Sequence, residues 1–130
     1  MAHESTLTGG ISEQLATAMF MAHGFNVFTA IVPDVYDLIV DGTDENGEHH
    51  RFTVQVKTLK IRGDRGGELV VKGCNADGKA YRKKDVDYLF GVHLPSNTGF
   101  LIPNNEQSEY WAKDFETARE KWTEYTLGGR

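Results

Sequence analysis

Cysteine and long apolar runs are scarce in this sequence, and each scarcity excludes a class of protein. The single cysteine, Cys74, excludes an internal disulfide and a multi-cysteine metal site, which favours a reducing, intracellular setting. No apolar run approaches the roughly 20 residues of a membrane-spanning helix, so we expect no membrane partner. Residues 1–6 contain neither the basic segment nor the apolar segment of a signal peptide.

Proline is also rare, and the chain has no repeats, no low-complexity tracts and no linker-like segment. Only 3 of the 130 residues are proline, while 39% are hydrophobic and 25% are charged, as in an ordinary globular protein. This length is typical of one domain. We therefore expect a single domain over residues 1–130.

Positive charge is absent from the first part of the chain. Residues 1–50 contain eight acidic residues and no lysine or arginine. Residues 51–84 contain ten basic and three acidic residues, and residues 85–130 contain four basic and eight acidic residues. The net charge of -5 therefore conceals a strongly basic middle segment. Such a segment is typical of a phosphate-binding surface, and equally of a solvated loop and hairpin face.

Hydrophobic periodicity predicts two helices separated by strands. Residues 11–22 carry Ile11, Leu15, Ala18, Met19 and Ala22 on one helical stripe, and Gly24 suits the left-handed position after the helix. Residues 52–59 form the clearest strand, because apolar and polar side chains alternate there. This order predicts an α/β fold with a mixed central sheet flanked by helices. The other predicted elements are strands at residues 25–29, 36–41, 68–72, 86–93 and 100–102 and a terminal helix at residues 106–125.

Four side chains of this pattern carry the chemistry of one candidate site. Asp37 opens an apolar strand, and Gln55 and Lys57 share one face of the next strand because strand side chains alternate. Oxygen ligands bind Mg²⁺, which activates a bound water and offsets charge on a phosphate, and a nearby ammonium stabilises the developing charge. We expect Glu13, on the first helix, to reach the same ion directly or through water. The predicted reaction is phosphodiester hydrolysis, with Glu13, Asp37, Gln55 and Lys57 as catalytic residues.

These residues lie in segments whose order resembles the PD-(D/E)xK nuclease superfamily. The chain looks most like the group I intron-associated homing endonucleases, which also tend to show Gln-Val-Lys-Thr where the general motif has an acid. Holliday junction resolvases are an alternative, because they also have a helix glutamate followed by a strand with an aspartate and a strand with an acid-x-Lys motif. The matching segments, within roughly residues 9–103, are residues 9–13 (GGISE), 24–27 (GFNV), 36–40 (YDLIV), 54–58 (VQVKT) and 85–89 (DVDYL).

The resemblance implies a restriction-endonuclease-like core and a Mg²⁺-dependent endonuclease, with Mn²⁺ as a possible substitute. It also implies double-stranded DNA as substrate, a homodimer or homotetramer, and a place in the cytoplasm of a bacterium or a phage-infected host. The metal ligands that it implies are Glu13, Asp37, Gln55 and the backbone at Val56.

Two features depart from the superfamily pattern. Gln55 replaces the usual acid, so Glu13 and Asp37 must supply the negative charge of the site. This weakens the resolvase alternative and leaves open a catalytically silent DNA-binding relative. Asp34 follows Pro33 and matches the letters "PD", but we prefer Asp37 because it enters the strand that pairs with Gln55.

Basic residues of the middle segment are the candidate DNA contacts. We expect the bases that follow Lys57 to lie beside the cleft, whereas those at residues 82–84 fit a solvated turn equally well. The adjacent His49 and His50 would point to opposite faces of a strand, so we expect loop histidines and no metal site. The predicted DNA-binding residues are Lys60, Arg62, Arg65, Lys72, Arg82, Lys83 and Lys84.

Overall fold

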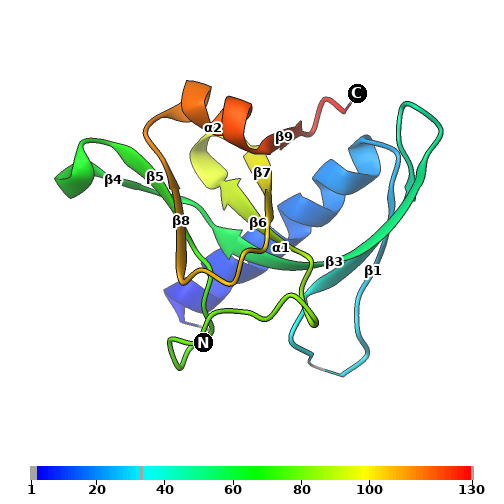
Figure 1. Ribbon diagram of the computed structural model, residues 1–130, viewed down its shortest axis with the longest axis horizontal. Coiled ribbons are helices and arrows are strands. Elements are labelled where there is room, and N and C mark those ends of the chain that lie inside the picture. Colours follow the sequence, from blue (N-terminus) through cyan, green and yellow to red (C-terminus); the bar gives the residue numbers. More distant parts are fainter. Residues whose placement is uncertain (1–2, 33, 130) are drawn as a thin grey trace.

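Helix α1 (Glu4–Ala22) lies across one face of a six-stranded sheet in the computed structural model, which describes residues 3–32 and 34–129 (Figure 1). The helix ends as expected, because Gly24 follows it with a φ of 90°. It begins earlier than the predicted residue 11, since Gly9 and Gly10 interrupt the apolar pattern without ending the helix. Among the described residues, no helix has the length and apolarity that a membrane crossing requires.

The buried stripe of α1 differs from the predicted one. Ile11 is 52% exposed, whereas Ser12 is 1% exposed. The buried side chains of the helix are Ser12, Ala16, Met19 and Phe20, so the contact face is rotated by about one residue, or roughly 100°, from the stripe through Ile11 and Leu15. The sequence did not reveal this face because its first buried residue is a serine, which hydrophobic periodicity counts as polar.

The central sheet has the strand order β1-β2-β3-β6-β7-β9. Strands β3 and β6 pair in parallel, and the other neighbours are antiparallel. The predicted α/β class with a mixed sheet flanked by helices is therefore confirmed. The strands are β1 (Asn26–Phe28), β2 (Leu38–Thr43), β3 (His49–Thr58), β6 (Tyr88–His93), β7 (Thr98–Pro103) and β9 (Thr123–Thr126).

A second sheet covers part of the other face of the central sheet. It contains β4 (Lys60–Arg62), β5 (Glu68–Lys72) and β8 (Glu109–Ala112) in the order β4-β5-β8, and the short helix η1 (Gly63–Arg65) joins β4 to β5. The β4–β5 end projects from the body of the molecule (Figure 1).

Two apolar cores follow from this arrangement. One lies between α1 and the central sheet and contains Phe20, Val54 and Phe90. The other lies between the two sheets, where a Cβ on Gly91 would come within 2.5 Å of Val71 Cγ2. The sheets can approach this closely because residue 91 has no side chain. The second 3-10 helix, η2 (Leu94–Ser96), joins β6 to β7.

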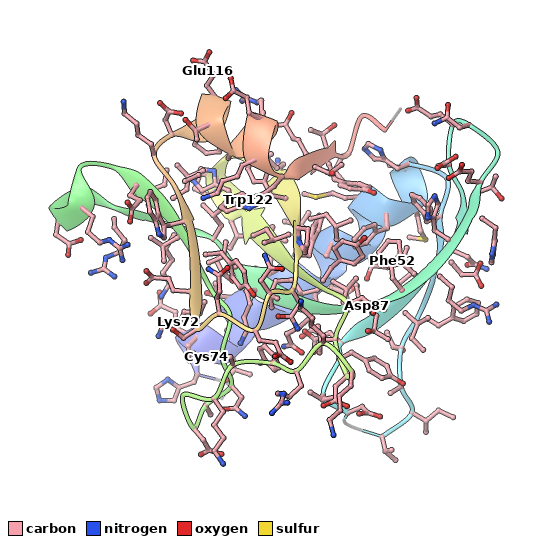
Figure 2. All side chains as sticks on the ribbon, viewed as in Figure 1. Phe52, Lys72, Cys74, Asp87, Glu116 and Trp122 are labelled. Carbon is pink, nitrogen blue, oxygen red and sulfur yellow. The ribbon has the colours of Figure 1, made fainter. Side chains whose placement is uncertain are left out.

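The predicted terminal helix over residues 106–125 is wrong. This segment forms β8, the helix α2 (Phe115–Lys121) and β9. Tyr110 alternates inward on a strand, and a new helix begins where the Asp114 carboxylate accepts a hydrogen bond from Thr117 N–H. Trp122 points from the end of α2 into the second core (Figure 2). The near-helical spacing of these aromatic residues was misleading, because they belong to separate elements that converge on one core.

Candidate active site

The pairing of β2 with β3 brings Asp37 beside the residues of the predicted motif. Leu38 lies opposite Val54, and both are buried beneath α1. Alternation along β3 therefore turns Gln55 and Lys57 to the face away from α1, while Asp37 directly precedes β2. The predicted strand at residues 36–41 is shifted to Leu38–Thr43, but Asp37 still extends the ladder, because its N–H donates to the Val54 carbonyl at 2.9 Å.

The carboxylate of Asp37 is held against the motif itself. Its Oδ2 accepts a hydrogen bond from the backbone N–H of Val56 at 2.9 Å. Val56 lies between Gln55 and Lys57 on β3, so this bond fixes the carboxylate beside the polar pair. Asp34 instead accepts from its neighbour, Val35 N–H, at 2.7 Å. The geometry thus supports Asp37 over Asp34 as the acid closer to the motif, while Pro33 lies outside the described residues.

Glu13 of α1 meets Asp37 in a pocket of about 210 Å³. Burial raises the pKa of Glu13, and the nearby Asp37 carboxylate raises it further. Burial also raises the pKa of Asp37, although the Val56 N–H and the Lys57 ammonium act in the opposite direction. The charge of Asp37 thus acts on Glu13, and the charge of Lys57 acts on Asp37, so Asp37 lies within electrostatic reach of both residues. The lining of the pocket is Glu13, Thr29, Ala30, Val32, Asp34, Tyr36 and Asp37.

This donor set fits a hard divalent cation. The pocket offers carboxylate oxygens from Glu13 and Asp37, and Gln55 precedes Val56, whose N–H holds the Asp37 carboxylate. Oxygen is the donor that Mg²⁺ and Mn²⁺ favour. Two half-buried carboxylates whose pKa values are raised by burial gain free energy when a cation neutralises them.

Lys57 makes two contacts that the sequence did not indicate. Its Nζ donates a hydrogen bond to the Cys74 carbonyl at 3.1 Å and lies 5.0 Å from the ring centroid of Tyr81. Figure 2 shows Cys74 in the segment that follows β5. No local pattern predicts such contacts, since they join β3 to a loop that is distant in sequence.

Four of the predicted DNA-binding residues lie between Lys57 and Cys74. Lys60, Arg62 and Lys72 belong to the second sheet, and Arg65 belongs to η1. The register of β4 with β5 puts Lys60, Arg62 and Lys72 on one face. Arg62 forms an ion pair with Asp64 at 2.7 Å. Neither Lys60 nor Lys72 forms an ion pair with any residue that the structure describes.

Arg65 is engaged as well, because it pairs with Glu68 and, at 3.1 Å, with Glu109. Arg62 and Arg65 therefore both have carboxylate partners within the protein. A phosphate that bound there would have to compete with those acids.

The basic residues at 82–84 follow Tyr81. Arg82 pairs with Glu106 at 3.1 Å, whereas Lys83 and Lys84 form no ion pair within the described ranges. Arg82 also lines a pocket of about 630 Å³ together with Val35, which is two residues from Asp37. The 82–84 segment therefore begins close to the loop that carries the candidate acid.

A separate acidic and histidine cluster lies at the other end of β2. Ligand atoms of Asp44, Glu48 and His50 lie within 4.8 Å of one another, and His50 Nε2 lies 2.7 Å from Asp44 Oδ2. His49 contacts Asp41 instead, at 2.6 Å. The two histidines point to different partners, as strand alternation requires, but they belong to β3 and not to a loop.

Comparison with known proteins gives a structural match. No family model matches the sequence, and no curated protein does. Among solved structures, the bacterial homing endonuclease I-Ssp6803I is similar, with a TM-score of 0.65 and 20% sequence identity over 86% of this chain and 80% of that chain. At this identity the likeness concerns the fold. The chain therefore has the α/β fold of a bacterial homing endonuclease.

Proposed function

We propose that this chain is a divalent-metal-dependent endonuclease that hydrolyses phosphodiester bonds in double-stranded DNA. The observation that carries the proposal is the meeting of Glu13 and Asp37 beside the Gln55–Lys57 pair, within a fold shared with a homing endonuclease. A half-exposed strand often carries polar residues at alternate positions. Two partly buried carboxylates and a lysine at one end of such a strand indicate a catalytic site much more specifically.

The proposed ligands of Mg²⁺ are the carboxylates of Glu13 and Asp37, the side-chain oxygen of Gln55 and the backbone at Val56. When bound, the ion would lower the pKa of a coordinated water and offset charge on the scissile phosphate. The Val56 N–H keeps the Asp37 carboxylate oriented toward the site. Lys57 supplies a cation that stabilises charge developing on the phosphate or orients the attacking water.

A homing or phage-encoded enzyme is the type that we propose. The structural neighbour is described as a homing endonuclease, and Gln55 fits the Gln-x-Lys pattern better than the acid-x-Lys pattern of resolvases. A domain of 130 residues covers only a short duplex. A long target would then require a homodimer or homotetramer whose symmetry matches the two halves of the site.

The second candidate is a DNA-binding relative without activity. Gln55 favours it, because an amide contributes no negative charge to a metal site. Glu13 and Asp37 must then hold the ion with two charges instead of three.

Cleavage of a supercoiled plasmid library with Mg²⁺ or Mn²⁺ tests the proposal. The wild-type protein should cleave duplex sites in the plasmids, and Asp37→Ala and Lys57→Ala should each lose at least about 100-fold in rate while still binding DNA. Asp34→Ala is the matched control, because Asp34 lines the same pocket but its carboxylate accepts a hydrogen bond from Val35 N–H and not from the motif. Four-way junctions belong in the same assay. Cleavage of junctions alone would favour a resolvase, and binding without any cleavage would favour the inactive relative.

A further inference from the structure

The ammonium of Lys57 is held by a loop that does not belong to the motif. It donates to the Cys74 carbonyl at 3.1 Å and faces the Tyr81 ring at 5.0 Å from the centroid. Tyr81 is 9% exposed, so the ring belongs to the second core and not to the surface. The lysine head is thus held between a carbonyl oxygen and an aromatic face.

The loop that presents these two groups is itself well fixed. Residues 73–81 fold back as a hairpin in which Cys74 and Ala80 form an isolated antiparallel bridge. Tyr81 N–H donates to the Gly73 carbonyl at 3.1 Å, and the Tyr81 carbonyl accepts from Asn104 Nδ2 at 3.1 Å. Asn104 is 4% exposed, so this anchor is buried. Both contacts of Lys57 therefore come from one rigid unit.

A lysine head needs such support to act at a single position. Its four-carbon stem is flexible, and an unrestrained ammonium samples many positions near a phosphate. The face of an aromatic ring attracts an ammonium through the quadrupole of the ring, and this attraction is stronger where water is excluded. We propose that Tyr81 is a positioning residue for Lys57: its ring holds the ammonium where it acts on the scissile phosphate. This inference rests on the nuclease function proposed above.

Two substitutions at Tyr81 separate the ring face from the other roles of the residue. Tyr81→Phe keeps the ring and removes the hydroxyl, so single-turnover cleavage should stay within about twofold of wild type. Tyr81→Leu keeps apolar bulk but removes the ring, so the cleavage rate should fall at least about tenfold while the Kd for DNA changes less than about twofold. Equal rates for Tyr81→Leu and wild type would overturn the inference, and so would a Tyr81→Phe variant as slow as Tyr81→Leu.

A series of fluorinated residues at position 81 tests the inference even if Tyr81→Leu fails to fold. Replacing Tyr81 with phenylalanine carrying one, two or three ring fluorines preserves shape while it weakens the negative face of the ring. The cleavage rate should decrease stepwise along the series. A rate that does not respond to fluorination would show that the ring acts by packing alone.

The NMR signal of the Lys57 ε-methylene group gives a readout that needs no cleavage. The ring current of Tyr81 should shift this signal upfield in wild type and Tyr81→Phe, and the shift should vanish in Tyr81→Leu. No upfield shift in the wild type would overturn the inference. A wild type that shows the shift but cleaves no DNA would overturn the nuclease function, and with it the role of Tyr81 in positioning Lys57 for cleavage.

Discussion

The hydroxyl groups of Ser12 and Thr58 lie 2.7 Å apart and form a hydrogen bond that joins α1 to β3. Ser12 directly precedes Glu13, and Thr58 directly follows Lys57. The bond therefore connects the helix and the strand next to the residues that the proposed site must bring together. Ser12 is 1% exposed, so a buried polar contact determines how the helix sits on the sheet.

Breaking this bond should weaken both stability and cleavage. Ser12→Ala leaves the partly buried Thr58 hydroxyl without its partner, which costs about 1–3 kcal/mol in the free energy of unfolding. Urea denaturation measures the loss, and the cleavage rate should fall as Glu13 becomes less well placed. The double variant Ser12→Ala/Thr58→Val removes both hydroxyls and should recover part of the stability. If the two single losses simply add, the hydroxyls do not interact.

The pH dependence of stability should reveal the two carboxylates whose pKa values are raised by burial. Asp37 and Glu13 have pKa values raised above the ordinary 3.8 and 4.5, so the folded protein binds their protons more tightly than the unfolded chain does. The stability that they contribute is complete below those ordinary values and is lost as the pH rises through the raised ones. Metal-free protein should therefore become less stable over this range.

Asp37→Asn should be more stable than wild type at neutral pH in EDTA, because an amide carries no charge and can still accept the Val56 hydrogen bond. Thermal denaturation from about pH 3 to pH 7 measures this, and the difference should disappear at the acidic end. Mg²⁺ should raise the Tm of the wild type more than that of the variant. A variant that is less stable than wild type at neutral pH would contradict the explanation.

Gln55→Glu tests whether this position binds metal. A third carboxylate should lower the Mg²⁺ concentration for half-maximal cleavage, by about tenfold or more, while cleavage itself persists. Gln55→Ala is the matched control and should raise that concentration. Titration of Mg²⁺ in the cleavage assay provides both values. Loss of cleavage in a folded Gln55→Glu protein, or unchanged Mg²⁺ dependence in both variants, would argue against a ligand at residue 55.

DNA affinity should depend more on Lys83 and Lys84 than on Arg62. The two lysines form no ion pair with a described residue, whereas Arg62 is bound to Asp64. Each lost phosphate contact should reduce the slope of log Kd against log salt concentration by about 0.9. Lys83→Ala and Lys84→Ala should show this change, and Arg62→Ala a smaller one. The reverse ranking would place the DNA on the projecting β4–β5 end.

The motif strand was predictable because its information is local. Alternation from residue 52 to residue 59 determines which side chains share a face, and Val54 and Val56 determine which face is buried. The pairing of Asp37 with β3 followed from a short hairpin. Local pattern and tertiary structure agree in this part of the chain.

The rest of the fold depended on contacts between distant segments. Tyr110 and Trp122 belong to different elements that converge on one core, although their spacing in the sequence is close to that of a helix. Ser12 is buried because Thr58 provides its hydrogen-bond partner, which hydropathy cannot detect. The contact of Tyr81 with Lys57 depends equally on how a loop closes over the strand.

The location of bound metal tests the proposed site most directly. Anomalous diffraction from crystals soaked in Mn²⁺ identifies the ion without any assumption about substrate. We predict an anomalous peak within bonding distance of both Glu13 and Asp37, next to Gln55. Crystals of Asp37→Asn should show a weaker peak. A peak confined to Asp44, Glu48 and His50, or no peak at saturating Mn²⁺, would contradict the account.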